Sequence, residues 1–269
     1  MSLRAFALAA ALASTAVLAE GPWEALEPGL ELGTFDGPAA PHGDRKIRVL
    51  RIDPARFELR LLNKSAPGQG RSRTAKDWCA QSGCVAATNP SMFHGDGRSV
   101  SYMRSATHVN NGKRSKDKTV LVFGPKKPGL APVRLLDRDC DEVDELLPQY
   151  ESAVQSIRMV SCRRKNVWAA AEKRWSAAAT GVDAQGRLLF VHVRSPYTMH
   201  ELVDALLALP LGLSRLLYGE GGPEAQLWVG AGGREISLVG SYETGFHEAD
   251  DVLGATPIPN VLAVFRRKP

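Results

Sequence analysis

The sequence has little that would suit a membrane, metal-binding or repeat protein. Only four of its 269 residues are cysteine, and 7% are aromatic. The cysteines form no Cys-x-x-Cys pair and have no histidines near them, so a zinc site is the less favoured interpretation of the four. After residue 19 no stretch is long and apolar enough to cross a bilayer. No repeat of solenoid length and no low-complexity segment is present.

The charge is moderately basic, with a formal net charge of +5. Short basic runs occur at 71–76, 113–118 and 163–165, but no aromatic residues alternate with them. Such runs are usually solvated faces, and we therefore expect no nucleic-acid partner. The charge suits an anionic ligand without requiring one. Nothing in the sequence indicates an oligomeric state.

The N-terminal segment is typical of a secretory signal peptide, predicted here over residues 1–19. Arg4 precedes an apolar stretch at 5–18, and small residues surround Ala19. No cysteine lies near the expected cleavage point, so a lipoprotein anchor is not supported. We predict a periplasmic or extracellular protein with a single domain over residues 20–269, whose 44% hydrophobic content suffices for a sizeable core.

Export also changes the interpretation of the cysteines, because an oxidising compartment favours disulfides over free thiols. Four cysteines allow three connectivities. We expect Cys79 to pair with Cys84, closing a small loop at a helix end, and Cys140 to pair with Cys162, tying a helical insertion to the strand after it.

Hydropathy patterning predicts both strands and helices. Segments 46–52 and 57–63 alternate apolar and polar residues around an Asp-Pro turn, which indicates two antiparallel strands. A tight turn at 181–187 precedes an apolar strand at 188–193, and segment 198–209 has helical spacing behind a threonine N-cap. We therefore expect an α+β fold, with a mixed and mostly antiparallel sheet core flanked by helices.

Two further segments carry predictions that involve charged residues. Residues 139–151 read as an acidic helix. Residues 153–160 read as a strand in which Gln155 or Ser156, and then Arg158, interrupt an apolar run. A polar side chain in such a strand needs a partner or a cavity. Arg158 can offer a bidentate fork to a phosphate, or it can pair with an acid such as Glu220.

A glycine-rich turn is the most informative feature of the chain. Glu220 and Glu224 lie on either side of Gly221, Gly222 and Pro223, between two apolar runs. Glycine allows close backbone approach and proline stiffens the chain, so both carboxylates are expected to be held in place. The alternative is an ordinary turn with two solvated glutamates, because short motifs carry a high false-positive risk.

With two other segments this turn resembles the phosphodiester glycosidase family, the group of the lysosomal uncovering enzyme and its bacterial relatives. The segments are Asn89-Pro90-Ser91-Met92-Phe93, Ala177-Ala178-Ala179-Thr180-Gly181 before Asp183, and Glu220-Gly221-Gly222-Pro223-Glu224. The resemblance covers most of the chain. It departs at two functional positions, because the family arginine aligns with Ala177 and the family aspartate aligns with Glu220.

The resemblance implies hydrolysis of a sugar joined through its anomeric carbon to a phosphodiester, giving free sugar and a phosphomonoester. Glu220 would be the base or nucleophile, with Glu224 positioning it or the attacking water. The expected contacts to phosphate or sugar are Arg158, Arg194, Asn89 and Ser91. Arg158 would stand in for the arginine missing at Ala177. No metal motif is present and no cofactor is expected, although a carboxylate-rich loop beside phosphate could recruit a divalent cation.

Three other residues are candidates for the rim of the site. Tyr197 follows Arg194 at the end of a predicted strand, where ligands collect in many α/β arrangements. Tyr242 and Glu243 lie in a polar loop that could border the same cleft, although a packing role for Tyr242 is an equal alternative. Glu220 with Glu243 is also the carboxyl pair that hydrolysis of a plain glycan would need. The alternative to catalysis is a secreted phosphosugar- or glycan-binding protein that has kept the fold and lost turnover.

Overall fold

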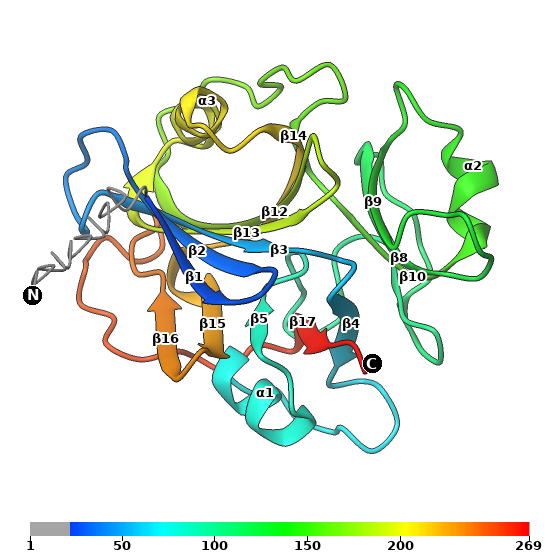
Figure 1. Cartoon of the computed structure of the whole chain (residues 1–269). Helices are drawn as coiled ribbons and strands as arrows, with labels where there is room; N and C mark the ends of the chain where they lie inside the picture. The colour runs from blue at the N-terminus through cyan, green and yellow to red at the C-terminus, as the bar shows by residue number, and fades with distance from the viewer. Residues whose placement is uncertain (1–21, 269) are drawn as a thin grey trace, which may run out of the picture.

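Three antiparallel sheets form the framework of the chain, which a computed structural model describes over residues 22–268 (Figure 1). The predicted signal peptide lies outside the described residues. Every pairing between strands that the structure describes is antiparallel. With three short helices, this confirms the α+β class and the mostly antiparallel core.

The first sheet is the largest and carries the glycine-rich turn. Its strands are, in spatial order, β1 (Trp23–Glu27), β2 (Leu30–Asp36), β3 (Lys46–Ile52), β13 (Leu188–Tyr197), β12 (Trp175–Asp183), β14 (Leu213–Gly221) and β11 (Arg158–Val160). The apolar runs of β12, β13 and β14 are buried on both faces, which explains why they lack a strict alternation of polar residues.

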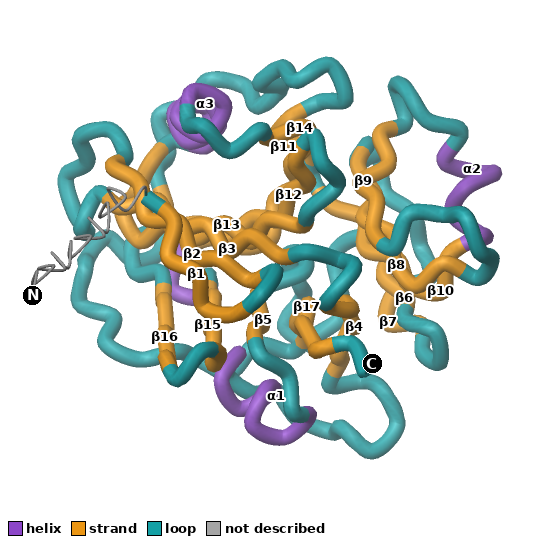
Figure 2. Tube along the Cα trace, viewed as in Figure 1, coloured by secondary structure: helices purple, strands orange, loops and turns teal. Residues whose placement is uncertain are grey.

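The second and third sheets have five strands each. The second has the order β7 (Val109–Asn111), β6 (Met103–Arg104), β10 (Tyr150–Ser156), β8 (Thr119–Pro125) and β9 (Val133–Asp137). The third has the order β16 (Arg234–Val239), β15 (Gln226–Ala231), β5 (Ala86–Thr88), β17 (Asn260–Arg266) and β4 (Phe57–Asn63). Figure 2 shows the second sheet to one side of the other two.

The two faces of the first sheet bury separate cores. One face contributes Leu50, Phe190 and Leu217 to a core shared with side chains of the other two sheets, such as Leu121 and Leu262. The opposite face packs against α3 (Met199–Ala208) through a set of fully buried aliphatic side chains: Val49, Val191, Leu202, Val203, Leu206 and Leu216. Each such side chain contributes about 1.5–3 kcal/mol on burial. The first sheet is therefore fixed on both faces.

The helices are short and begin at identifiable caps. The Thr198 hydroxyl accepts the Glu201 N–H and the Glu201 carboxylate accepts the Thr198 N–H, so α3 starts with a capping box. Thr74 caps α1 (Ala75–Ser82), which covers the third sheet with the buried Trp78. The remaining helical pieces are α2 (Val143–Leu146) and the 3-10 turns η1 (Leu147–Gln149) and η2 (Gly222–Glu224). No helix within residues 22–268 is long and apolar enough to span a membrane.

Two sequence-based expectations about pairing and helix length are corrected. Segments 46–52 and 57–63 are strands, β3 and β4, but they pair with different partners in different sheets, because the chain turns at Asp53 and leaves the first sheet. The predicted helix at 139–151 shrinks to α2 and η1. Its first residues form a turn instead, in which the carboxylates of Asp137 and Asp141 accept main-chain N–H groups.

The strand predicted at 153–160 is two strands in two sheets. β10 belongs to the second sheet and β11 to the first, and the chain crosses between them at Ile157. The Ile157 carbonyl accepts the Tyr218 N–H, and the Ser156 hydroxyl donates to the Tyr218 carbonyl at 2.6 Å. This crossing decides where the Arg158 side chain lies.

Candidate active site

The glycine-rich turn at the end of β14 is shaped by close backbone packing. A Cβ on Gly219 would lie 2.8 Å from the Ala178 carbonyl oxygen and 2.9 Å from that of Asn89, so no larger residue fits there. Gly222 has a φ of 59°, in the left-handed region that glycine tolerates best. The β12–β14 pairing also shifts register next to the turn. Glu220 is therefore held on a rigid part of the sheet rather than on a loose loop.

Three glutamates converge on this turn. Glu220 is only 8% exposed, and its carboxylate accepts the N–H of Gly221 at 3.0 Å. Burial, together with the charges of Glu224 and Glu243, raises the pKa of Glu220 to about 8, although the hydrogen bond from the Gly221 N–H acts to lower it. Burial also raises the pKa of Glu224 and of Glu243. The structure thus brings together the two glutamates of the turn and the predicted Glu243, which comes from a distant loop.

This cluster has almost no positive charge near it. None of the three glutamates forms an ion pair with a residue that the structure describes. Lys173 is the cation that acts on the cluster, and its charge lowers the pKa of Glu243 against the effect of burial. The nearby Arg174 is bound to Glu201 through two bonds of 2.6 and 2.9 Å.

Aromatic side chains lie beside the glutamates, and the sequence analysis did not single them out. A Cβ on Gly221 would lie 2.3 Å from the Tyr218 hydroxyl and 2.6 Å from Cδ1 of Trp175. Trp175 also forms an isolated antiparallel bridge with Glu243. Burial, and then the charge of Glu220, raise the pKa of Tyr218 well above its usual value. The sequence signal that could have identified this aromatic group is a pair of tryptophans, Trp168 and Trp175, in and directly after the irregular segment 163–174.

Asn89 and Ser91 support the site rather than face a ligand. The Asn89 side chain donates to the Glu224 carbonyl at 2.9 Å and accepts the Gln226 N–H at 2.7 Å, so both ends of its amide are used in holding η2. The Ser91 hydroxyl lies 2.9 Å from that of Ser99, and Ser91 is 3% exposed. Because both side chains are almost fully buried, they are placed to support the turn rather than to contact sugar or phosphate directly.

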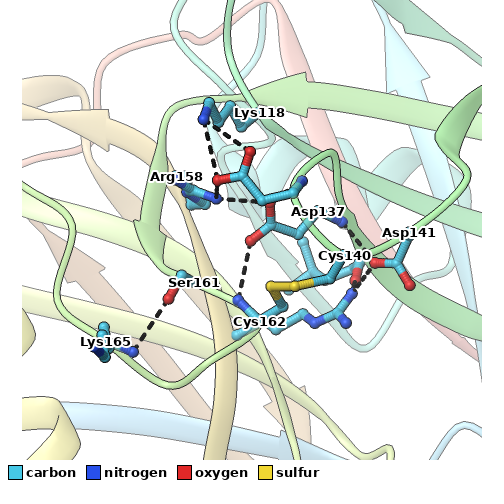
Figure 3. A network of polar contacts seen from close by, with 11 residues as sticks. Lys118, Asp137, Cys140, Asp141, Arg158, Ser161, Cys162 and Lys165 are labelled. Atoms are coloured by element: carbon cyan, nitrogen blue, oxygen red, sulfur yellow. Dashed lines mark hydrogen bonds and ion pairs between the residues drawn. A yellow bond between two sulfur atoms is a disulfide. The ribbon is translucent and has the colours of Figure 1, made fainter.

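Arg158 lies in a different ion network and does not reach the glutamates. Its Nη1 is 2.7 Å from a carboxylate oxygen of Asp137 and 2.7 Å from one of Asp139 (Figure 3). Asp137 is 1% exposed and also accepts the Cys162 N–H at 2.9 Å. The pairing with an acid was one of the two alternatives, but the acids are these aspartates and not Glu220. Arg158 is therefore placed to stabilise the junction of β9 and β11, not to bind a ligand beside Glu220.

Arg194 and Tyr197 are also occupied by the fold. Arg194 pairs with Asp250 at 2.7 Å and donates to the carbonyls of Val239 and Val252, so it fastens the loop before β17. Tyr197 is fully buried in the core beneath α3, and its hydroxyl donates to the Pro38 carbonyl at 3.0 Å. Tyr197 is therefore too deeply buried to contact a substrate, and Arg194 is engaged by Asp250 rather than by any of the three glutamates.

Tyr242 lies next to Glu243 but its ring stacks on His42, with centroids 5.2 Å apart. Its carbonyl accepts the N–H of Ser176 from the start of β12 at 2.9 Å, so the loop that carries Glu243 is tied to the first sheet. The packing alternative for Tyr242 is therefore supported. A cavity of about 750 Å³ lies elsewhere, between β4 and the end of β8, and contains none of the three glutamates.

Both predicted disulfides are confirmed. Cys79 pairs with Cys84 at the end of α1, and Cys140 pairs with Cys162 across the Asp137 network. No group of three or more His, Cys, Asp or Glu within residues 22–268 has an arrangement that could hold a metal ion.

The comparison with known families now has a geometric context. A sequence profile described as phosphodiester glycosidase matches residues 82–265. The chain belongs to the phosphodiester glycosidase family. Ala177, the position at which the sequence resemblance predicts an arginine, is 1% exposed and pairs directly with Gly221.

Solved structures agree with the fold at low sequence identity. The catalytic domain of zebrafish N-acetylglucosamine-1-phosphodiester alpha-N-acetylglucosaminidase, auto-inhibited by its pro-peptide, superimposes with a TM-score of 0.64 at 14% identity, covering 91% of this chain and 86% of that one. A hypothetical protein from Synechocystis gives 0.57 at 12% identity, covering 93% of this chain and 64% of that one. No curated protein matches the sequence.

Proposed function

We propose that this protein hydrolyses the bond between the anomeric carbon of a sugar and a phosphodiester, with Glu220 as the proton donor. The observation that carries the proposal is the pKa of about 8 of the buried Glu220. At pH 7 this carboxyl is mostly protonated, so it suits a general acid. The base or nucleophile role that the sequence suggested for Glu220 is not the one that its burial favours.

A protonated Glu220 would also allow a phosphodiester to bind without an arginine beside it. An ionised carboxylate facing a phosphodiester would repel it, whereas a neutral carboxyl can donate a hydrogen bond to a phosphate oxygen. A bound anion would in turn favour the protonated form of Glu220, because a nearby negative charge raises the pKa of a carboxyl. Protonation of Glu220 and binding of the substrate would therefore favour each other.

Glu243 is the residue we assign as the base. The charge of Lys173 favours the ionised form of Glu243. No cation that the structure describes acts on Glu220 in this way. The bond from the anomeric carbon to the phosphate oxygen breaks with its electron pair on the oxygen, which takes the Glu220 proton. A water oxygen bonds to the anomeric carbon and its proton passes to Glu243. The products are free sugar and a phosphomonoester, and proton exchange with solvent restores both carboxyls.

The location of the protein belongs to the same proposal. Two disulfides fit an oxidising compartment, and we propose that the protein acts in the periplasm or outside the cell, as the predicted signal peptide implies. The proposed hydrolysis uses only the carboxyl groups of Glu220 and Glu243 and a water molecule, without a cofactor.

A second function is favoured by one specific observation. Ala177 replaces the family arginine, and Arg158 and Arg194 are both held in other ion pairs. A protein that binds phosphosugars or glycans without turning them over would have this pattern, because binding does not need the group that stabilises a leaving phosphate.

A panel of synthetic substrates separates these functions. The mature protein is incubated with sugar-1-phosphodiesters and with phosphate-free alkyl glycosides of the same sugars, and the release of reducing sugar is measured. We expect release from at least one phosphodiester, and loss of that release in Glu220→Gln but not in a variant of an exposed glutamate, Glu145→Gln. Binding of the panel without any release supports the second function instead. Release only from alkyl glycosides contradicts the phosphodiester assignment.

A further inference from the structure

Three aromatic rings form a wall next to the glutamate cluster, in which neighbouring rings meet at angles of 53° and 61°. The Trp168 ring lies 5.3 Å from that of Tyr218, centroid to centroid, and 6.4 Å from that of Trp175. Tyr218 is buried, whereas Trp168 and Trp175 are each partly exposed. The two tryptophans therefore keep part of their surface available beside the cluster.

The wall and the glutamates belong to one site. Gly221 fits under the Tyr218 hydroxyl and the Trp175 indole, and Trp175 bridges to the main chain of Glu243. The charges of Glu220 and Glu243 both act on the Tyr218 hydroxyl. A ring seated against the tryptophans would thus have carboxyl oxygens within reach of its substituents.

Polar contacts hold Trp168 firmly, although it lies in an irregular segment. The main-chain N–H of Trp168 donates to the side-chain oxygen of Asn166 at 3.0 Å, and the main-chain carbonyl of Trp168 lies 2.6 Å from Nδ1 of His200 on α3. The Asn166 amide donates to the His200 carbonyl and, at 2.8 Å, to Asp204. These bonds fasten the main chain of the segment to α3, and the indole packs against the buried Tyr218 ring, so both are in place before any ligand arrives, which lowers the ordering cost of binding.

We propose that Trp168 and Trp175 form the platform on which the sugar ring of the substrate stacks, and that the sugar is an uncharged pyranose. An aromatic face gains from contact with the apolar C–H face of a sugar, while the carboxyls accept hydrogen bonds from its hydroxyls. A sugar that carries its own carboxylate would place a further negative charge beside Glu224 and Glu243, away from the protonated Glu220 that receives the phosphate, and would be disfavoured. The proposal rests on the glycosidase function, but it concerns binding and not turnover.

The test follows sugar binding through tryptophan fluorescence, without any reaction. Free glucose and N-acetylglucosamine are titrated into the full protein, with glucuronate as the charged counterpart. We expect a saturable change with at least one neutral sugar and none with glucuronate. Trp168→Ala should weaken binding by about tenfold or more, Trp168→Phe should weaken it less, and Trp228→Phe on β15 should leave it unchanged.

A second measurement needs no variant. Oxidation of indoles by N-bromosuccinimide, followed by peptide mass analysis, should be slowed by the bound sugar at Trp168 and Trp175 and not at Trp228. Equal protection at all three residues, equal sugar affinity of wild type and Trp168→Ala, or no saturable change with any neutral sugar overturns the platform. Wild type that binds sugar as expected but releases none from the phosphodiester panel overturns the glycosidase function alone, and leaves the platform standing.

Discussion

Two clusters of acidic side chains, both next to the first sheet, differ in how their charge is compensated. At the junction of β9 and β11, Asp137 and Asp139 are bound by Arg158, and Lys118 also binds Asp139. Hydrogen bonds from Lys118 and Arg158 lower the pKa of Asp139. At the end of β14, Glu220 has no cation and its pKa is raised to about 8. The buried Asp137 would become an uncompensated charge without Arg158, whereas a buried acid without a cation partner is a candidate for chemistry.

The largest expected effect concerns turnover at the uncompensated cluster. Glu220→Gln keeps the shape and the hydrogen bond from Gly221 but removes the acidic proton. We expect kcat/KM for a phosphodiester substrate to fall by about 100-fold or more, the usual contribution of a general acid. Rates are compared with those of Glu145→Gln, an exposed control. A Glu220→Gln protein as fast as wild type would contradict the mechanism.

Arg158→Ala tests the compensated cluster and should act on stability instead. Asp137 would lose its partner while still buried, so we expect the free energy of unfolding to fall by about 2–3 kcal/mol. In denaturant titrations Arg71→Ala, an exposed arginine, serves as control and should change little. The folded variant should keep kcat/KM within about threefold of wild type. A large loss of activity with unchanged stability would show that Arg158 serves the substrate after all.

The pH dependence of stability gives a third contrast. Because the pKa of Glu220 is about 8 in the folded protein and near 4.5 when unfolded, the unfolded chain releases this proton first as pH rises. The contribution of Glu220 to stability is therefore favourable at low pH and is lost between about pH 4.5 and 8. Relative to wild type, Glu220→Gln should gain about 4 kcal/mol on going from pH 5 to pH 9, at about 1.36 kcal/mol per pKa unit. A constant difference across this range would show that Glu220 ionises normally.

Glu224→Gln should give the smallest effect. It removes one of the like charges that raise the pKa of Glu220, and leaves the main-chain carbonyl that Asn89 holds. We expect the pKa of Glu220, measured by isotope-edited NMR of side-chain carboxyls, to fall by about half a unit to one unit. Glu172→Gln, at an exposed position before β12, is the matched control. An unchanged or higher pKa in Glu224→Gln would mean that the two carboxyls do not interact.

Local patterns in the sequence predicted the parts of the site that depend on local structure. The turn with Glu220 and Glu224, the Thr198 cap and strand bounds such as 46–52 and 57–63 all follow from spacing and residue type. The even number of cysteines and the expected oxidising compartment predicted two disulfides, and the observed pairing is one of the three connectivities that four cysteines allow.

What could not be predicted depends on which sheet each strand joins. Arg158 follows a single apolar run in the sequence, but that run splits between two sheets at Ile157, which turns the arginine toward Asp137. Trp168 and Trp175 come together with Tyr218 only through the placement of the 163–174 segment over β14. Asn89 was expected to face a ligand, yet its amide is consumed by η2, because a buried side-chain amide must find its partners within the fold.

The Cys140–Cys162 bond lies at the start of the segment that carries Trp168 and leads into Trp175, the first residue of β12. A copy of the protein kept among thiol reductants would lose the covalent anchor at one end of that segment and keep only its contacts with α3. Reduction of this bond would leave the three glutamates in place while loosening the stretch of chain that carries Trp168, so the proposed sugar platform depends on the oxidised state of one cysteine pair.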